Sequence, residues 1–153
     1  MDTAPPEVRI EIARLNALRS PCQKSRRGAV MWSDQLQGVG FNGLLGGQVC
    51  TGDEACRAVC GRRCIHAEQA ALLHWSQLAE LRELHPAVLR QMLHVKVDDA
   101  GLVVASGPPS CMECAKLILF GGVQIMWLLH EAGWRAYTAF DFYRETQRFM
   151  KGA

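Results

Sequence analysis

The chain lacks the long apolar run of a membrane-spanning helix and the leader of a secreted protein. Its longest apolar region, Leu117 to Leu129, is interrupted by Gly121-Gly122 and Gln124, and it is shorter than the roughly 20 residues that cross a bilayer. Residues 1–7 are acidic and interrupted by proline, unlike a secretory signal. We therefore expect a cytoplasmic protein with no membrane partner.

Strong charge of either sign is also absent, as are repeats, linkers and low-complexity segments. The formal net charge of +2 is too small to indicate nucleic-acid binding by itself. Hydrophobic residues make up 49% of the chain and charged residues 21%, as in globular proteins. A length of 153 residues provides for one hydrophobic core rather than two, so we expect residues 1–153 to form a single domain.

Cysteine, by contrast, is plentiful. The chain has seven cysteines, an odd number, and no export signal, which favours metal binding or reactive thiols over a disulfide framework. Two of them form a Cys-x-x-Cys motif, and the other five are Cys22, Cys50, Cys56, Cys60 and Cys64.

Helical and strand-like patterns alternate along the chain. Apolar spacing and turn residues predict helices at 7–18, 66–84, 111–120 and 139–150. Runs of β-forming residues predict strands at 28–32, 37–41, 92–97, 102–105 and 123–129. Residues 44–64 are rich in glycine, cysteine and charge and show no periodicity, so we expect a loop there. This order predicts an α/β sandwich with a mixed sheet.

Two short motifs carry most of the chemical information in the chain. The first is His66-Ala67-Glu68, and the second is Pro109-Ser110-Cys111-Met112-Glu113-Cys114. Cys111 and Cys114 are three residues apart at a predicted helix start, where their side chains share one face and the helix dipole lowers thiol pKa values. His66 opens the preceding helix and can face the same point.

One imidazole and two thiolates would leave the fourth tetrahedral position of zinc open, as a catalytic site requires. Glu68 lies near enough to reach a metal-bound water without being a ligand, which suits a proton shuttle. A Cys-x-x-Cys motif alone is equally typical of a redox pair or of half a structural zinc site, and His-x-Glu triplets are common at solvated helix starts. The two motifs in this order predict a catalytic zinc site.

On these residues the chain resembles the cytidine/deoxycytidylate deaminase superfamily, and within it the deoxycytidylate deaminase branch. The resemblance runs from about Ser20 to Leu129. It rests on the two motifs above, supported by Ser20-Pro21-Cys22, Gly28-Ala29-Val30 and Gly40-Phe41-Asn42-Gly43. Two departures are Ser110, which stands between the proline and Cys111, and the absence of a proline in Leu44-Leu45-Gly46-Gly47, where that branch often has one.

The resemblance implies a three-layer α/β/α sandwich with a central mixed sheet of about five strands. It also implies that a zinc ion held by His66, Cys111 and Cys114 activates a hydroxide that attacks C4 of a cytosine-type ring. Glu68 would protonate N3 and then the departing amine. A homo-oligomer is expected on the same ground.

Further residues are candidates for substrate contacts. The resemblance implies that Asn42 contacts the sugar, although Asn-Gly is equally typical of a turn. Ala67 and Ser110 would present backbone groups to the base. A set of basic residues could converge near the site and bind a phosphate, or form an ordinary solvated surface: Lys24, Arg26, Arg27, Arg57, Arg62 and Arg63.

The five remaining cysteines predict a second zinc. Some deoxycytidylate deaminases carry a second, structural zinc, and Cys22 and Cys50 fall at the matching places. We assign Cys56 as a third ligand and Cys60 or Cys64 as the fourth. A loop without a core needs such a cross-link, which four thiolates around zinc supply. Free cysteines, or a labile disulfide between Cys60 and Cys64, are the alternatives.

The leading hypothesis is therefore a zinc hydrolase acting on a nucleotide or nucleoside, with deoxycytidylate favoured. A second hypothesis is a deaminase of bases in single-stranded DNA or RNA, which would stack extruded bases on aromatic side chains. A third is a zinc-stabilised interaction module without catalysis, against which Glu68 argues. The other histidines, including His94, have no motif partners in the sequence and receive no role.

Overall fold

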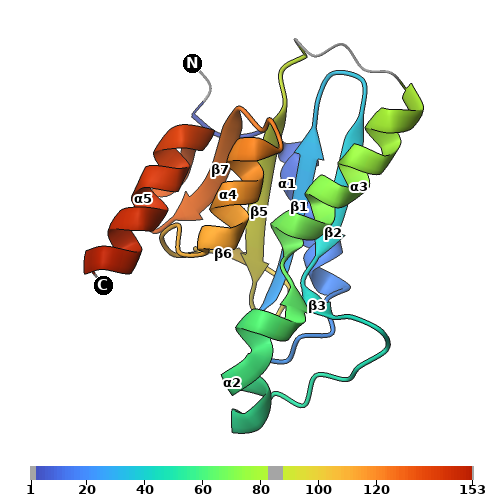
Figure 1. Ribbon diagram of the computed structural model, residues 1–153, viewed down its shortest axis with the longest axis vertical. Coiled ribbons are helices and arrows are strands. Elements are labelled where there is room, and N and C mark those ends of the chain that lie inside the picture. Colours follow the sequence, from blue (N-terminus) through green and yellow to red (C-terminus); the bar gives the residue numbers. More distant parts are fainter. Residues whose placement is uncertain (1–2, 83–87, 153) are drawn as a thin grey trace.

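The computed structural model describes residues 3–82 and 88–152, which form a mixed β-sheet with helices on both faces (Figure 1). The predicted three-layer α/β/α sandwich is confirmed. The elements in chain order are α1 (Glu7–Leu18), β1 (Arg26–Trp32), β2 (Gln37–Phe41), β3 (Gly43–Leu44), α2 (Glu54–Arg63), β4 (Cys64–Ile65), α3 (Ala67–Arg82), β5 (Gln91–Val97), β6 (Val103–Val104), α4 (Met112–Phe120), β7 (Ile125–His130), β8 (Gly133–Thr138) and α5 (Ala139–Gly152).

The main sheet has the strand order β2-β1-β5-β7-β8, and the short β6 adds to β5. Only β5 and β7 run parallel; every other pair in the sheet is antiparallel. A parallel pair needs a crossover, and α4 supplies it. A separate two-stranded ladder pairs Gly43 with Ile65 and Leu44 with Cys64, and it holds the chain before α3 next to the end of β2.

Side chains of the two central strands alternate between the two faces of the sheet. On one face, Val30 of β1 and Leu93 of β5 are fully buried against α1. On the other face, Met31 and Met92 are fully buried beneath α3, α4 and α5. Figure 1 shows the same division, with α1 behind the sheet and the other three helices in front. The sheet therefore separates two apolar layers.

Helix α3 lies unusually close to β2 at a glycine. A Cβ atom at Gly40 would be 2.5 Å from the Ala71 nitrogen and 2.7 Å from the Ala67 carbonyl oxygen, closer than real Cβ atoms come to backbone. Only a residue without a side chain permits this approach. Gly40 thus fixes the first turn of α3, which carries Glu68, against the sheet.

The predicted loop over 44–64 is wrong in its second half, where α2 runs from Glu54 to Arg63. Asp53 caps this helix, because its carboxylate accepts a hydrogen bond from the Cys56 backbone nitrogen at 2.7 Å. Arg62 and Arg63 in the last turn interact favourably with the helix dipole. The helix has no buried apolar stripe, so the capping residues, rather than periodicity, are the signal in the sequence.

Strand β8 is absent from the sequence prediction. It is an edge strand in which only Tyr137 is buried, so alternation of apolar and polar residues is weak. The predicted helix at 66–84 begins at Ala67 in the structure, and residues 83 and 84 lie outside the described residues. No helix in the described part of the chain is long and apolar enough to cross a membrane.

Candidate active site

His66 is held at the start of α3. Its backbone nitrogen donates a hydrogen bond to Gln69 Oε1 at 2.9 Å, and its carbonyl oxygen accepts one from the Ala70 nitrogen at 3.0 Å. These contacts are those of a residue that caps a helix N-terminus, with the side chain three residues on bonded back to the cap. The imidazole is therefore placed by the backbone at the junction of β4 and α3.

The two motif cysteines are held at the start of α4. Cys111 caps the helix, and its sulfur accepts a hydrogen bond from the Cys114 backbone nitrogen at 3.4 Å. Cys114 lies in the first turn and is buried. Both sulfurs thus lie at the positive end of the helix dipole, which stabilises thiolates.

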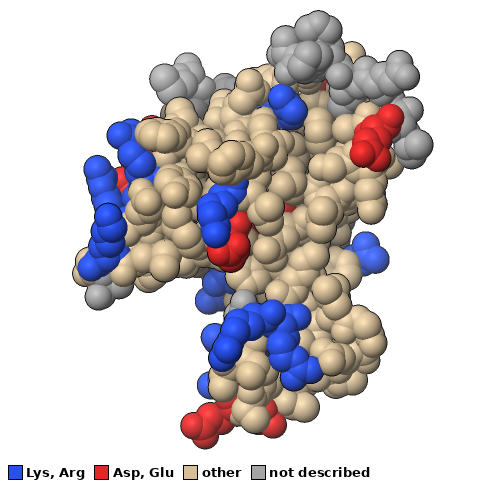
Figure 2. All heavy atoms as spheres, viewed as in Figure 1, with Lys and Arg blue, Asp and Glu red and all other residues tan. Residues whose placement is uncertain are grey.

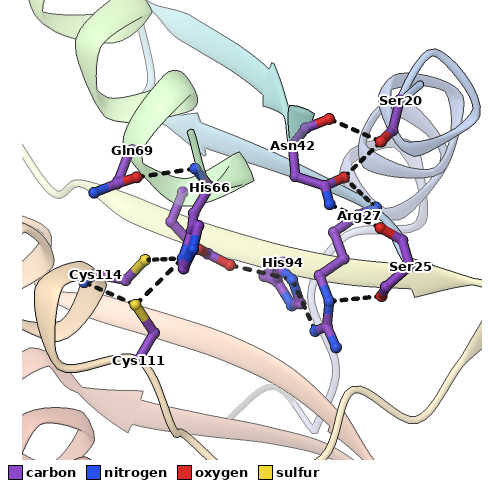
Figure 3. Close-up of polar contacts among 10 residues, drawn as sticks. Ser20, Ser25, Arg27, Asn42, His66, Gln69, His94, Cys111 and Cys114 are labelled. Carbon is purple, nitrogen blue, oxygen red and sulfur yellow. Dashed lines mark hydrogen bonds and ion pairs between the residues drawn. The ribbon is translucent and has the colours of Figure 1, made fainter. Parts of the chain in front are cut away.

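The structure brings these three side chains together, although His66 and Cys111 are 45 residues apart in sequence (Figure 3). His66 Nδ1 lies 3.2 Å from Cys111 Sγ and 3.1 Å from Cys114 Sγ. Among the described residues, this is the one group of three or more possible ligands whose donor atoms all lie within 4.8 Å of one another. A tetrahedral zinc would hold a nitrogen and a sulfur ligand about 3.5 Å apart, so the two nitrogen–sulfur edges of the triangle are within a few tenths of an ångström of that spacing.

The protonation of the two thiols also fits a cation site. The hydrogen bond from Cys114, followed by that of His66, lowers the pKa of Cys111 to about 5. The same bond with Cys111, together with burial, raises the pKa of Cys114. The pair therefore shares one proton at neutral pH, and a divalent ion would replace that proton when it binds.

Glu68 lies beside the donor triangle on the first turn of α3, with 13% of its side chain exposed. Its Oε1 is 3.1 Å from Nε2 of His94. Burial opposes ionisation of the carboxyl, but His94, the Cys114 thiol and His66 outweigh it and lower the pKa of Glu68. The side chain is thus a largely buried carboxylate next to, and outside, the three donors.

These groups open into a cavity of about 300 Å³. The cavity volume is at the lower end of the range for small-molecule sites. All three predicted substrate contacts, Asn42, Ala67 and Ser110, line its wall, as do His66, Glu68, Cys111 and Cys114. The wall is closed on the α5 side by Phe142.

Asn42 organises the loop between α1 and β1. Its Oδ1 accepts hydrogen bonds from Ser20 Oγ at 2.7 Å and from the Arg27 backbone nitrogen at 2.8 Å, and its Nδ2 donates to the Ser25 carbonyl oxygen at 2.7 Å (Figure 3). These three bonds tie the end of β2 to both ends of the loop. Asn42 therefore shapes the cavity wall directly.

Three of the six candidate basic residues reach the cavity, namely Lys24, Arg27 and Arg57. Arg26 instead donates a hydrogen bond to the Asp98 carbonyl oxygen at 2.7 Å, and the cavity lining does not include Arg62 or Arg63. Figure 2 shows Lys and Arg side chains gathered where α2 projects from the rest of the molecule. Positive charge thus lies on the α2 side of the cavity.

Four of the five other cysteines form two close pairs, and the fifth, Cys22, is buried and lines the cavity. Cys50 Sγ lies 3.8 Å from Cys56 Sγ, and Cys60 Sγ lies 3.4 Å from Cys64 Sγ. Burial, followed by the hydrogen bond with Cys60, raises the pKa of Cys64 to about 12. Four thiolates around zinc would be about 3.8 Å apart on every edge, and no three of these sulfurs meet that condition in the described structure. All seven cysteines are free thiols.

His94 was not among the predicted site residues. The residue lies on β5 with 3% of its surface exposed, directly against Glu68. The alternation of side chains along the predicted strand at 92–97 could have pointed to it, because His94 and Met92 lie on the same face of the strand, which packs under the helices. A histidine in that apolar row is a buried polar group that requires a partner.

Sequence comparison finds no matching family model and no matching curated protein. The fold is nevertheless similar to solved structures. A cytidine deaminase from Burkholderia pseudomallei aligns over 91% of this chain and 96% of its own, with a TM-score of 0.60 and 16% identity. A dCMP deaminase from the cyanophage S-TIM5, in complex with dCMP and dUMP, aligns over 80% and 81%, with a TM-score of 0.55 and 20% identity.

A cytidine deaminase from Mycobacterium tuberculosis aligns over 88% of this chain and 90% of its own, with a TM-score of 0.52 and 19% identity. At such identities the likeness identifies the fold. The chain has the fold of the cytidine/deoxycytidylate deaminase superfamily, as the two motifs predicted.

Proposed function

We propose that this protein is a zinc-dependent hydrolase that deaminates a cytosine-type base in a nucleotide or nucleoside, with deoxycytidylate favoured. The observation that carries the proposal is the triangle of His66 Nδ1, Cys111 Sγ and Cys114 Sγ beside the largely buried carboxylate of Glu68, in the wall of one cavity. In this proposal residues 1–153 act as a single catalytic domain.

The three donors are one imidazole and two thiols, a set that suits zinc and not magnesium or calcium, which prefer oxygen ligands. His66, Cys111 and Cys114 would hold the ion and leave one tetrahedral position for solvent. When bound there, zinc would lower the pKa of a water molecule toward neutrality and so supply the nucleophile.

Glu68 would move the protons of the reaction. Its carboxylate would accept a proton from the attacking water, pass it to ring N3, and later protonate the amine that leaves as ammonia. Water would add across the N3–C4 double bond. The C4–amine bond would then break as Glu68 carries the proton of the new C4 hydroxyl to the amine, so ammonia departs and the uracil-type base remains. The low pKa of Glu68 keeps it ionised and ready to accept the first proton.

The charge of the cavity supports a nucleotide substrate. Lys24, Arg27 and Arg57 line it, and Glu68 is the acidic residue among the lining side chains. Guanidinium and ammonium groups bind phosphate oxygens through charge-assisted hydrogen bonds. The S-TIM5 enzyme of similar fold was solved with dCMP and dUMP, which is consistent with this choice of substrate.

An ammonia-release screen tests the proposal. The substrates are cytidine, deoxycytidine, their monophosphates, adenosine, guanine and a short single-stranded oligonucleotide, which also tests the nucleic-acid alternative. We expect release from deoxycytidylate, and its loss in Glu68→Gln with zinc content and melting temperature unchanged. If Glu68→Gln retains wild-type activity, the assignment of Glu68 is wrong; if no substrate releases ammonia from the zinc-loaded protein, the proposed function is wrong.

A second, structural zinc at Cys22, Cys50, Cys56, Cys60 and Cys64 remains part of the proposal. Two sulfur pairs at 3.8 and 3.4 Å supply two edges of a four-thiolate site, and Cys64 also interacts electrostatically with Cys22 and Cys50. Elemental analysis should give two zinc ions per chain. A value of one zinc ion per chain would rule out this second site and leave the proposed catalytic site intact.

A cytoplasmic location and a homo-oligomeric assembly also stand as predictions.

A further inference from the structure

His94 occupies a position in the fold where an apolar side chain would be expected. It lies in the middle of β5, and its strand neighbour on β1 is Ala29, which is fully buried. Met92, two residues earlier on the same face, is also fully buried. A polar ring in this layer is unfavourable unless it is hydrogen-bonded, so its contacts indicate why it is there.

The ring nitrogens of His94 are unequally satisfied. Nε2 lies 3.1 Å from Glu68 Oε1 and 3.4 Å from Arg27 Nη1, whereas Nδ1 has no hydrogen-bond partner in the described part of the chain. Burial lowers the pKa of His94 to about 4, so the ring is neutral at pH 7 and carries one N–H. Nε2 therefore cannot both donate to Glu68 and accept from Arg27.

The shorter contact and the charge of the carboxylate favour the tautomer in which Nε2–H donates to Glu68 Oε1. This choice leaves Nδ1 as a buried acceptor without a partner among the described residues. Such an atom makes the ring a poor core residue. Its contribution therefore lies in what it does to Glu68 rather than in packing.

Glu68 has three rotatable bonds, and a proton shuttle acts only from the correct orientation. The His94 contact fixes one carboxylate oxygen, and the carboxylate also interacts with the Cys114 thiol on the side of the metal ligands. On the basis of the proposed deaminase function, we propose that His94 is a positioning residue that holds the Glu68 carboxylate in the orientation from which it transfers protons.

The test uses variants that differ in where they place a donor. His94→Gln puts an amide N–H near the position of Nε2, whereas His94→Asn puts it near Nδ1 and His94→Leu has none. We expect kcat for deoxycytidylate to fall about 10- to 100-fold in the Leu and Asn variants, as for other residues that orient a catalytic group, with KM changed less than threefold. His94→Gln should recover most of kcat. His130→Gln, which alters a histidine bonded to Tyr137 away from the cavity, is the matched control and should behave as wild type.

Two readouts do not depend on turnover. Nitrogen-15 NMR of the histidine rings in the wild-type protein should show the Nε2–H tautomer for His94. Thermal unfolding should give a lower melting temperature for His94→Leu, which leaves the Glu68 carboxylate without its donor, and most of the wild-type value for His94→Gln, which restores a donor.

The outcomes separate this inference from the proposed function. If the wild type releases ammonia and His94→Leu keeps its kcat within threefold, the positioning role is wrong and the proposed function stands. Equal loss of kcat and of melting temperature in the Leu and Gln variants would show a packing role and would also overturn the inference. An Nδ1–H tautomer would contradict the assigned hydrogen bond whether or not the protein is active.

Discussion

The molecule contains two groups of cysteines that differ in how the fold supports them. Cys111 caps α4 at the edge of the main core and Cys114 lies inside it. Both sulfurs meet His66, from another helix start, at 3.1 to 3.2 Å. Cys56, Cys60 and Cys64 lie on or beside α2, which projects from the sheet and has no buried apolar stripe. The first group is compact because two packed helices, α3 and α4, converge on it. The second group is divided into the pairs Cys50–Cys56 and Cys60–Cys64, because only a short helix and loops hold these cysteines.

Electrostatics follow the same division. Hydrogen bonds with Cys114 and His66 lower the pKa of Cys111 to about 5, whereas burial and the Cys60 contact raise the pKa of Cys64 to about 12. A thiol is a ready metal ligand where the fold supplies donors to its thiolate. Where neighbouring thiols merely approach one another, the protonated form is favoured.

The largest expected difference is between two variants that each remove one thiol, one from each group of cysteines. Cys111→Ser replaces a thiolate of the triangle and should reduce ammonia release at least about 1,000-fold, because the open metal site is lost. Cys56→Ser alters the other group and should leave kcat within a few-fold of the wild-type value. Any effect of this variant should appear in the melting temperature instead. Parallel measurements of zinc content and activity decide this; comparable loss of activity in both variants would show that the two groups act as one site.

The pH dependence of stability should distinguish the buried site from the rest of the metal-free protein. The pKa of His94 is about 4 in the folded state and about 6.5 when unfolded, and its neighbours are Glu68, Arg27 and His66. Between these values the unfolded state binds more protons, so stability falls as pH decreases from 6.5 to 4. This group alone contributes about 3 kcal/mol to the change.

Urea unfolding at pH 7 and pH 4 measures this effect, with His94→Gln as the comparison. The free energy of unfolding should fall more in the wild type than in the variant. A parallel fall in both proteins would show that other groups account for the acid sensitivity.

Alkylation of the metal-free protein by iodoacetamide at pH 7 should favour Cys111 over Cys64. The thiolate fraction favours Cys111 by about 10⁵, given pKa values of about 5 and 12. The greater intrinsic nucleophilicity of the more basic thiolate offsets about 10³ of this, so Cys111 should react about 100-fold faster. Peptide mass spectrometry follows each site, and faster labelling of Cys64 would reverse the electrostatic comparison.

The smallest effect concerns the helix that supports the second group. Asp53→Ala removes the cap of α2, whose carboxylate accepts from the Cys56 nitrogen, and should speed amide exchange in α2 several-fold. Exchange in α4 should not change, because Cys111 caps that helix. Mass-detected hydrogen exchange compares the two helices, and equal acceleration in both would show that α2 is integral to the main core.

Prediction from sequence succeeded where the signal was local. Apolar spacing predicts helix α1 with its observed bounds, Glu7–Leu18, and the motif at Cys111 coincides with the start of α4. It failed for α2, whose stability depends on caps instead of a buried stripe, and for β8, whose place at the sheet edge leaves most of its side chains outside the core. Both α2 and β8 have little of the apolar periodicity from which a helix or strand can be predicted.

The sequence by itself determined which side chains could bind a metal, because helix starts and a three-residue spacing fix how His66, Cys111 and Cys114 are presented locally. Only the tertiary structure decided that Glu68 meets His94. That contact joins the first turn of α3 to the middle of β5, and it depends on the register of β5 against β1 and on the close approach of α3 at Gly40. Such neighbours across a core are set by packing between elements, which no periodicity within one element can report.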